Sequence, residues 1–325
     1  MPGRPHRREV RAVRRVGQGV ERGQERVTGV LERVEQPASA RRRLSAALFR
    51  RPRVRLAGLL TLPATWLVLV YLSALLSLLV TAFFTVDEFT GAVVRELTLD
   101  NVREVLTTPA YVGAAVRTVA IAVTVTVLCV LLGFPMAFFM AKVAPARART
   151  LLVALVVTPL WASYLVKVYA WQAMVQPETG LIAWALRPFG LSGPGFGVTA
   201  TVLTLTYLWL PYMVLPVYAG LERMPDSLLD ASGDLGARPA RTVRSVVVPL
   251  IWPSIVAGSV FTFSLSLGDY ITVQIVGGRT QMIGNIVYQT YTSNLPFAAA
   301  IALIPVAIMV VYLSLVRRTG ALDTL

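Results

Sequence analysis

One acidic side chain within the apolar stretches of this sequence is a first candidate for chemistry. Asp269 lies in a long apolar segment and is accompanied by Tyr270 and Gln274. A carboxylate beside an aromatic ring can bind an amine through an ion pair and a cation–π contact. Because an ionisable group in lipid faces a partner or a cavity, these residues are candidates for lining a path for a small cationic solute.

A second candidate group surrounds Lys167 in another apolar segment, where Tyr169 and Trp171 follow it. These residues could line the same path, but the ammonium group would repel a cationic solute. The competing interpretations are a lysine that extends to the membrane surface and a structural ion pair between Lys167 and Asp269. Both the ion pair and the path could also alternate during transport.

The sequence lacks the residues that most enzymes need. Its two lysines are Lys142 and Lys167, and neither follows glycine, so no phosphate-binding loop of the Gly-x-x-x-x-Gly-Lys type is present. With a single histidine, His6, and a single cysteine, Cys129, a Cys/His metal cluster and a nucleophile–histidine pair are excluded. We expect a chain that is not an enzyme and binds no cofactor or metal.

The elements that must position these residues are long apolar helices. The mean hydropathy is +0.65 and 55% of the 325 residues are hydrophobic, which is too apolar for a water-soluble domain of this size. Six segments are long enough for a helix to cross a bilayer. The predicted fold class is all-α, a polytopic membrane protein with six transmembrane helices at 59–84, 118–140, 151–174, 199–220, 254–275 and 297–316.

The basic residues that give the net charge of +14 are concentrated in the N-terminal tail and in alternate loops. Residues 1–56 hold 16 of the 31 basic residues, and further basic residues lie in the 141–150 loop, including Lys142 and Arg149, and in the 221–252 loop. Basic loops remain on the cytoplasmic side. We therefore predict a multi-pass plasma-membrane protein with both termini in the cytoplasm, and we interpret the charge as topology, not as a sign of nucleic-acid binding.

The sequence divides into two parts. Residues 1–56 form a basic cytoplasmic tail, which is either an amphipathic helix on membrane lipid or a partner, or a partly disordered segment. Residues 57–325 form the transmembrane domain.

The 221–252 loop is unusually long for a connection between two membrane helices. Asp226 and Ser227 follow a proline and can cap a helix predicted over 227–235, while Gly236 can end that helix in a left-handed conformation. A second helix is predicted from Pro239 toward Val248, with prolines that kink the entry to the fifth membrane segment. A short helix of this kind on the membrane surface can be gripped by a partner protein.

The loop resembles the signature loop of ATP-binding-cassette (ABC) importer permeases, which reads Glu-Ala-Ala, three residues, Gly, nine residues, Ile, one residue, Leu-Pro. Here Asp stands for Glu and Ser for the second Ala, while the spacing is kept throughout. The resemblance implies that this loop couples the chain to a separate ATPase. The implied coupling residues are Leu229, Asp230, Ala231, Ser232, Asp234, Leu235, Gly236, Ala237, Pro239, Val246, Val248 and Pro249.

Other segments narrow the resemblance to spermidine/putrescine-type permeases. Those segments are Gly268-Asp269-Tyr270, Val276-Gly277-Gly278 and Met282-Ile283-Gly284-Asn285. The chain looks like the first of two permease subunits of that type, with a type I importer fold and a core module at about 112–318. The implied cargo is a polyamine such as spermidine or putrescine. The same pattern also covers amino-phosphonates, ferric iron and opine-like compounds.

The resemblance also implies a set of partners. An extracytoplasmic binding protein delivers the solute, a second permease subunit forms the other half of the path, and two copies of an ATPase bind ATP and magnesium inside the cell. Two other classes compete with this reading. A stand-alone secondary carrier would need several intramembrane acids and inverted repeats, and a membrane receptor or scaffold would not explain the 230–249 pattern.

Overall fold

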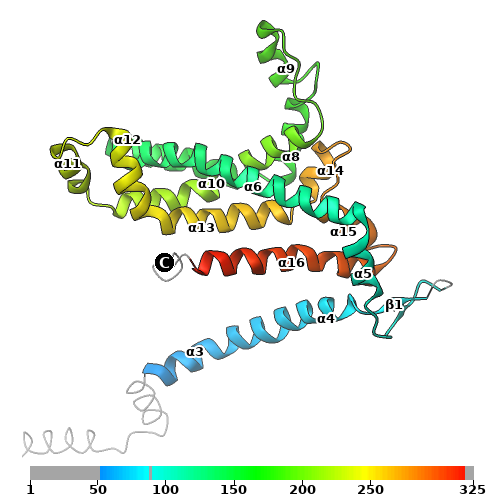
Figure 1. Ribbon diagram of the computed structural model, residues 1–325. Coiled ribbons are helices and arrows are strands. Elements are labelled where there is room, and N and C mark those ends of the chain that lie inside the picture. Colours follow the sequence, from blue (N-terminus) through cyan, green and yellow to red (C-terminus); the bar gives the residue numbers. More distant parts are fainter. Residues whose placement is uncertain (1–51, 88–89, 319–325) are drawn as a thin grey trace, which may run out of the picture. The chain divides into compact units, whose positions relative to one another are not determined.

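The computed structural model of the chain describes residues 52–87 and 90–318, and these are mostly helical (Figure 1). Nearly all of the tail predicted over 1–56 lies outside the described residues. The chain divides into two compact units, 1–74 and 75–325, which are described separately.

The described part of the first unit is helical throughout. Helix α3, Pro52–Trp66, contains Pro63 and continues through a π-helical turn, η1, Leu67–Leu72. The helix then runs on as α4, Ser73–Thr81, and the stretch Leu59–Thr81 is apolar and long enough to cross a membrane. The first predicted segment, 59–84, is confirmed with an end three residues earlier.

A short segment outside the long helices follows α4, and its two strands were not anticipated in the all-α prediction. Strands β1, Thr85–Val86, and β2, Val93–Val94, pair antiparallel, and helix α5, Asp100–Thr107, comes next. The Asn101 side chain donates hydrogen bonds to the carbonyls of Ala82 and Phe84 at 3.2 and 2.8 Å. This amide therefore holds the start of α5 against the end of α4.

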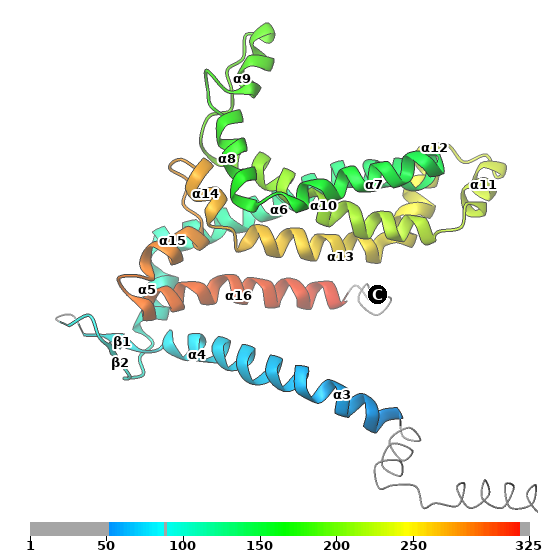
Figure 2. The ribbon, with the colours of Figure 1, turned by 180° about the vertical axis from the view of Figure 1, so that it is seen from behind.

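Three long helices form the core of the second unit. They are α6, Pro109–Phe138, which continues through the π-helical turn η2, Phe139–Val143; α10, Val198–Arg223; and α13, Val248–Leu267. Helix α10 packs against both others (Figures 1 and 2).

Two glycines set the close approach of these helices to Met213 of α10. A Cβ atom on Gly133 of α6 would lie 3.1 Å from the Met213 Cγ, and one on Gly258 of α13 would lie 3.2 Å from the Met213 Cα. The absence of side chains at these two positions lets the three helices pack as one tight layer.

The third predicted segment, 151–174, is wrong as a single helix. It consists of α7, Ala146–Trp161, and α8, Tyr164–Met174, with a bend of 95° between them. Ala162 and Ser163 at the break have extended ψ values of 142° and 138°. Beyond α8 lie α9, Leu181–Leu186, and the 3-10 turn η3, Arg187–Phe189, which ends at Gly190 with a left-handed φ of 68°.

The fifth predicted segment, 254–275, is also interrupted. Helix α13 ends at Leu267, and a separate short helix, α14, spans Ile271–Val276. The last two helices are α15, Ile283–Thr290, and α16, Leu295–Arg318. Asp269 therefore lies in a break between two helices and not inside a transmembrane helix.

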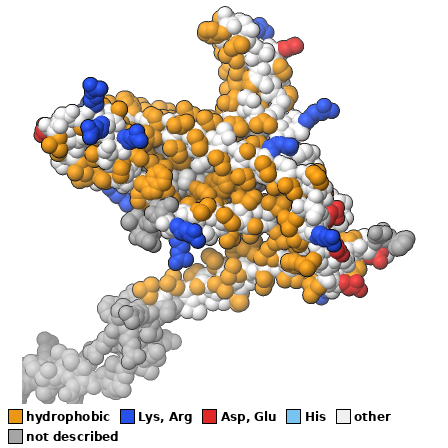
Figure 3. Space-filling model, viewed as in Figure 1, with side chains coloured by type: hydrophobic (Ala, Val, Ile, Leu, Met, Phe, Trp, Pro, Cys, Tyr) orange, Lys and Arg blue, Asp and Glu red, His pale blue; other side chains and the backbone are white. Residues whose placement is uncertain are grey.

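Within the described residues, five helices are long and apolar enough to cross a membrane, and the bent α7–α8 pair makes up to six spans. Apolar side chains cover most of the helical surface, and basic side chains gather at the end that carries α11, Ser227–Asp234, and α12, Pro239–Thr242 (Figure 3). The C-terminal end of α16 lies at the same end of the second unit, while α9, α14 and α15 lie at the other (Figures 1 and 2).

Candidate functional site

The polar loop between α10 and α13 contains the short helix α11. Gly236 has a φ of +75°, and the N–H of Ala237 donates to the carbonyl of Ser232 at 3.1 Å. This is the Schellman arrangement, in which a left-handed residue ends the helix and satisfies its last carbonyls. The helix predicted over 227–235 and its left-handed glycine end are both confirmed.

The residues of the signature pattern on α11 face mainly outward. Leu235 is 89% exposed, and Asp230, Ala231 and Asp234 are exposed as well. A leucine this exposed at the end of a surface helix is available for contact with another protein.

Two residues of the same pattern face inward and attach α11 to its neighbours. The side chain of Ser232 is 9% exposed, and its Oγ lies 2.8 Å from the Oγ1 of Thr242 on α12. Leu229 is half-buried and packs against the hydrophobic core. The helix therefore has one attached face and one free face.

The second half of the pattern lies on an uninterrupted helical run. It begins with Pro239 at the start of α12 and continues through the π-helical turn η4, Val243–Val247, directly into α13. The helix predicted from Pro239 toward Val248 is confirmed, and Pro249 lies in the first turn of α13. Val246 and Val248 are half-buried on this run.

Lys142, at the end of α6, holds the base of α11 from another part of the chain. Its Nζ lies 2.6 Å from the Oδ1 of Asp226 and donates to the carbonyl of Met224, also at 2.6 Å. The hydrogen bond and the positive charge of Lys142 hold the pKa of the Asp226 carboxyl below its usual range. Asp226 or Ser227 was expected to cap α11. Asp226 is the N-cap residue but forms no side-chain cap, and its carboxylate is directed to Lys142 instead.

Asp269 is the centre of a buried polar cluster at the break between α13 and α14. It is 6% exposed, and its Oδ1 accepts a hydrogen bond from the N–H of Thr272 at 2.8 Å. Its Oδ2 accepts a hydrogen bond from the Tyr164 hydroxyl, and that hydroxyl lies 2.7 Å from the Thr272 Oγ1. Because Tyr164 is the first residue of α8, this carboxylate joins the two helix breaks.

Lys167 does not pair with Asp269. It is half-buried on α8, one turn after Tyr164. The structural ion pair between Lys167 and Asp269, which was one interpretation of the sequence, is not formed in the described part of the chain. Tyr164, which the sequence did not single out for this role, partners the carboxylate instead. The position of Ser163 and Pro159 ahead of it is the local signal that could have indicated a helix start there.

Aromatic rings extend from this cluster along α10. Tyr164 stacks on Trp209 with ring centroids 6.1 Å apart, and Trp209 contacts Tyr212 edge-on at 5.8 Å. Trp171 of α8 contacts Tyr207 at 5.4 Å. The rings hold α8 against the core, so Trp171 has a packing role in this conformation.

The other candidate path residues are only partly brought together. Tyr169 is 56% exposed on α8, and Gln274 is exposed on the neighbouring α14. Tyr270 stacks on Tyr288 of α15 at 4.8 Å and lines a groove of about 400 Å³ with residues of α15 and α16. Tyr270 is therefore engaged with α15, whereas Tyr169 and Gln274 remain accessible.

The segment 282–285 packs against the backbone of the Asp269 cluster. The N–H of Ile283 donates to the Thr118 Oγ1 at 2.9 Å, and Asn285 accepts from the N–H of Met282 at 2.6 Å. A Cβ atom on Gly284 would lie 3.0 Å from the Asp269 carbonyl oxygen. The glycine thus lets α15 approach the backbone of the break.

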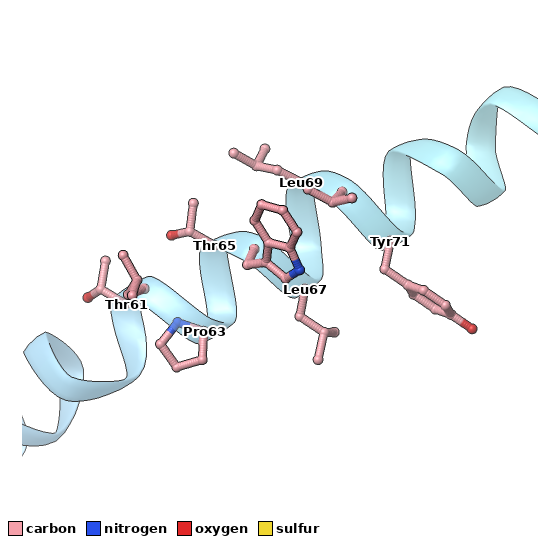
Figure 4. Close-up of a pocket in the computed structure, with 9 residues that line it drawn as sticks. Thr61, Pro63, Thr65, Leu67, Leu69 and Tyr71 are labelled. Carbon is pink, nitrogen blue, oxygen red and sulfur yellow. The ribbon is translucent and has the colours of Figure 1, made fainter.

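A groove on the first helix is formed by residues of that helix alone. It is lined by nearby side chains of α3 and η1, including Pro63, Leu67 and Tyr71 (Figure 4). Its lining is almost entirely apolar and contains no ionisable group apart from the Tyr71 hydroxyl. It offers no charged group for recognising an ionic solute.

Comparison with known proteins assigns the family. Residues 130–319 match the family model of the binding-protein-dependent transport system inner membrane component. The chain belongs to this family. The permease is 43% identical over 300 residues to the inner membrane ABC transporter permease protein YdcU of Escherichia coli K12, covering 87% of this chain and 95% of that protein. It is 30% identical over 263 residues to the spermidine/putrescine permease PotB of the same organism, covering 79% and 94%.

Solved structures agree on the fold. A bacterial alginate ABC transporter in complex with a periplasmic protein gives a TM-score of 0.63 at 16% identity, covering 86% of the permease and 97% of that chain. A second alginate importer structure gives 0.61 at 17% identity, covering 85% and 99%. Together with the family match and the two permease relatives, this makes the chain a multi-pass membrane subunit of an ABC importer and not its catalytic component.

Proposed function

We propose that this permease forms half of the import path for a small cationic amine of the spermidine/putrescine type. The observation that carries the proposal is the buried Asp269 carboxylate at the junction of two helix breaks. The likeness to PotB, a spermidine/putrescine permease, supports the same cargo class. A permease of this type forms its path together with a second permease subunit and receives the amine from an extracytoplasmic binding protein.

The carboxylate has capacity for a cargo amine. Ionised Asp269 can accept about four hydrogen bonds, of which the Thr272 N–H, the Tyr164 hydroxyl and the Thr272 hydroxyl occupy three. Since Asp269 is 6% exposed, an amine reaches it when α8 moves and withdraws Tyr164. The Asp269 carboxylate then exchanges a neutral donor, the Tyr164 hydroxyl, for the charged ammonium group of the cargo, which forms the stronger hydrogen bond.

The accessible residues beside the cluster would complete the path. Tyr169 and Gln274 are exposed on the two helices that meet there. Trp171 and Tyr270, which pack against Tyr207 and Tyr288 in this conformation, would offer aromatic faces for cation–π contact once those ring contacts open. Lys167 would disfavour a cation at its own position and so direct the amine toward Asp269. An anionic cargo such as an amino-phosphonate would instead depend on Lys167.

The proposal extends to the coupling loop. In it, α11 lies in the cytoplasm with both termini, and its free face is gripped by an ATPase present in two copies. The ATPase, and not this chain, binds ATP and magnesium. The exposed Leu235 and the basic side chains at this end of the molecule support that orientation.

Uptake of labelled putrescine and spermidine by cells that depend on this permease tests the cargo. We expect Asp269→Asn to reduce uptake by about tenfold or more, the effect of a lost charged contact, and Lys167→Met to leave it unchanged or raised. Unchanged uptake in Asp269→Asn would remove Asp269 from the path. Loss of uptake in Lys167→Met alone would favour an anionic cargo.

A further inference from the structure

The contact between Lys142 and the base of α11 joins two regions that are 84 residues apart in the sequence. Lys142 ends the helical run of α6, whereas Met224 and Asp226 form the connection between α10 and α11. Neither Lys142 nor Asp226 belongs to the signature pattern itself.

The burial of the two partners differs strongly. The Lys142 side chain is 6% exposed and that of Asp226 is 79% exposed. An exposed carboxylate contributes little to an ion pair because water screens it. The buried bond from Lys142 to the Met224 carbonyl is therefore the more important of the two, since Met224 is itself only 4% exposed.

The turn that carries Lys142 is braced independently of α11. Arg149 on the first turns of α7 donates from Nη2 to the carbonyl of Ala141 at 2.8 Å. This bond ties α7 back to the end of α6, so the segment 139–149 can move as one piece. A displacement of Lys142 would consequently be passed to α6 and α7 together.

We propose that Lys142 is a positioning residue for energy coupling, which transmits displacement of α11 to α6 and α7. This inference rests on the proposed role of α11 as the ATPase contact. Without Lys142, α11 would remain connected to α13 through the Ser232–Thr242 contact and the helical run of α12 and η4. Movement of the ATPase would then reach α13 but not the α6–α7 pair.

The test uses the complete transporter, with spin labels on Cys residues introduced at the exposed positions Arg147 and Gly233 and with Cys129 replaced by Ser. We expect the distance between the two labels to stay constant on ATP binding in the parent protein, because the two segments move together. In Lys142→Met the distance should change on ATP binding, and uptake per ATP hydrolysed should fall by about tenfold or more, as for loss of a hydrogen bond to a charged group.

Three further variants sharpen the result. Lys142→Arg keeps the charge and should retain most coupling, while Asp226→Asn keeps the Met224 bond and should lose much less than Lys142→Met. Arg238→Met removes an exposed positive charge from the same loop and should behave as the parent protein. Equal coupling in Lys142→Met and Arg238→Met, with an unchanged label distance, would overturn the inference.

The two proposals fail in different ways. If the parent protein does not co-purify with an ATPase, the proposed function of α11 is wrong. The contact of Lys142 with Met224 and Asp226 is then tested in the permease alone, where Lys142→Met must broaden the distribution of distances between the two labels. A narrow distribution in that variant would show that Lys142 does not position α11.

Discussion

The Asp269 cluster and the α11 loop are both polar regions of an otherwise apolar protein, but they are built in opposite ways. At Asp269 the polar atoms are buried and satisfy one another across two helix breaks. On α11 the signature residues are mostly exposed, and the helix is attached by a few contacts along one face.

The difference separates two requirements of a transporter subunit. A buried polar cluster holds one arrangement until something replaces its hydrogen bonds, because an unpaired polar group in the interior is costly. An exposed helix with few contacts leaves its free face for another protein. We therefore expect changes at the cluster to reduce stability, and changes on the free face of α11 to reduce coupling alone.

The largest loss of stability is expected from Asp269→Leu. The Thr272 N–H would lose its acceptor, and a buried unsatisfied group costs about 1–3 kcal/mol, while the Tyr164 hydroxyl would keep only its contact with the Thr272 Oγ1. The thermal unfolding midpoint of the purified permease should fall clearly. Gln274→Leu, at an exposed position on α14, is the matched control, and equal midpoints for the two variants would contradict the buried-cluster interpretation.

Gly284→Ala should have the next largest effect. The added Cβ would lie 3.0 Å from the Asp269 carbonyl oxygen, and such overpacking typically costs about 1–3 kcal/mol. Gly113→Ala provides the comparison, since a Cβ there meets nothing within 4 Å. If denaturation in mild detergent gives the same stability for both, the close approach of α15 to the break is not required.

Gly236→Ala should lower the stability less than these two variants but should reduce ATP-driven uptake. A Cβ at this position meets no atom within 4 Å, yet the φ of +75° is unfavourable for alanine by about 1–2 kcal/mol. The end of α11 should shift, and ATP-driven uptake should fall while the protein remains in the membrane. Asparagine tolerates the left-handed conformation better than alanine. If Gly236→Asn reduced uptake as much as Gly236→Ala, the cause would be the added side chain on the protein surface and not backbone strain.

Ala231→Trp is expected to leave stability within about 0.5 kcal/mol, as for most exposed substitutions. Its bulk on the free face of α11 should still weaken co-purification of the ATPase. Ala240→Trp makes the same change at an exposed position of α12 outside the defining residues of the pattern. ATPase binding that is normal in Ala231→Trp, or equally weak in both variants, would remove the distinction between the two regions.

Local sequence signals were sufficient for α11. Proline before Asp226 and the glycine at 236 fixed its limits to within one residue of Ser227–Asp234. The same local reasoning was wrong about the Asp226 side chain, because its partner Lys142 is brought near only by the packing of α6 against α10.

Hydropathy located the spans but not their breaks. The windows at 151–174 and 254–275 are apolar on average, and an average over such a window contains no information on where the helix axis changes direction. The breaks at Ala162–Ser163 and after Leu267 are connected by the Tyr164–Asp269 hydrogen bond, which joins residues 105 positions apart and is not visible to a local window. Proline at 159 and glycine at 268 were the available hints.

The 95° bend between α7 and α8 has a consequence for what can surround the protein. Each helix end at the bend has backbone N–H or carbonyl groups that find no partner within its own helix. Hydrocarbon chains cannot hydrogen-bond such groups, so irregular backbone at membrane depth must be lined by protein or by water. The side of the molecule that carries Ala162 and Ser163 is therefore unsuited to a lipid environment, and a bilayer containing this subunit alone would be deformed or hydrated at that point.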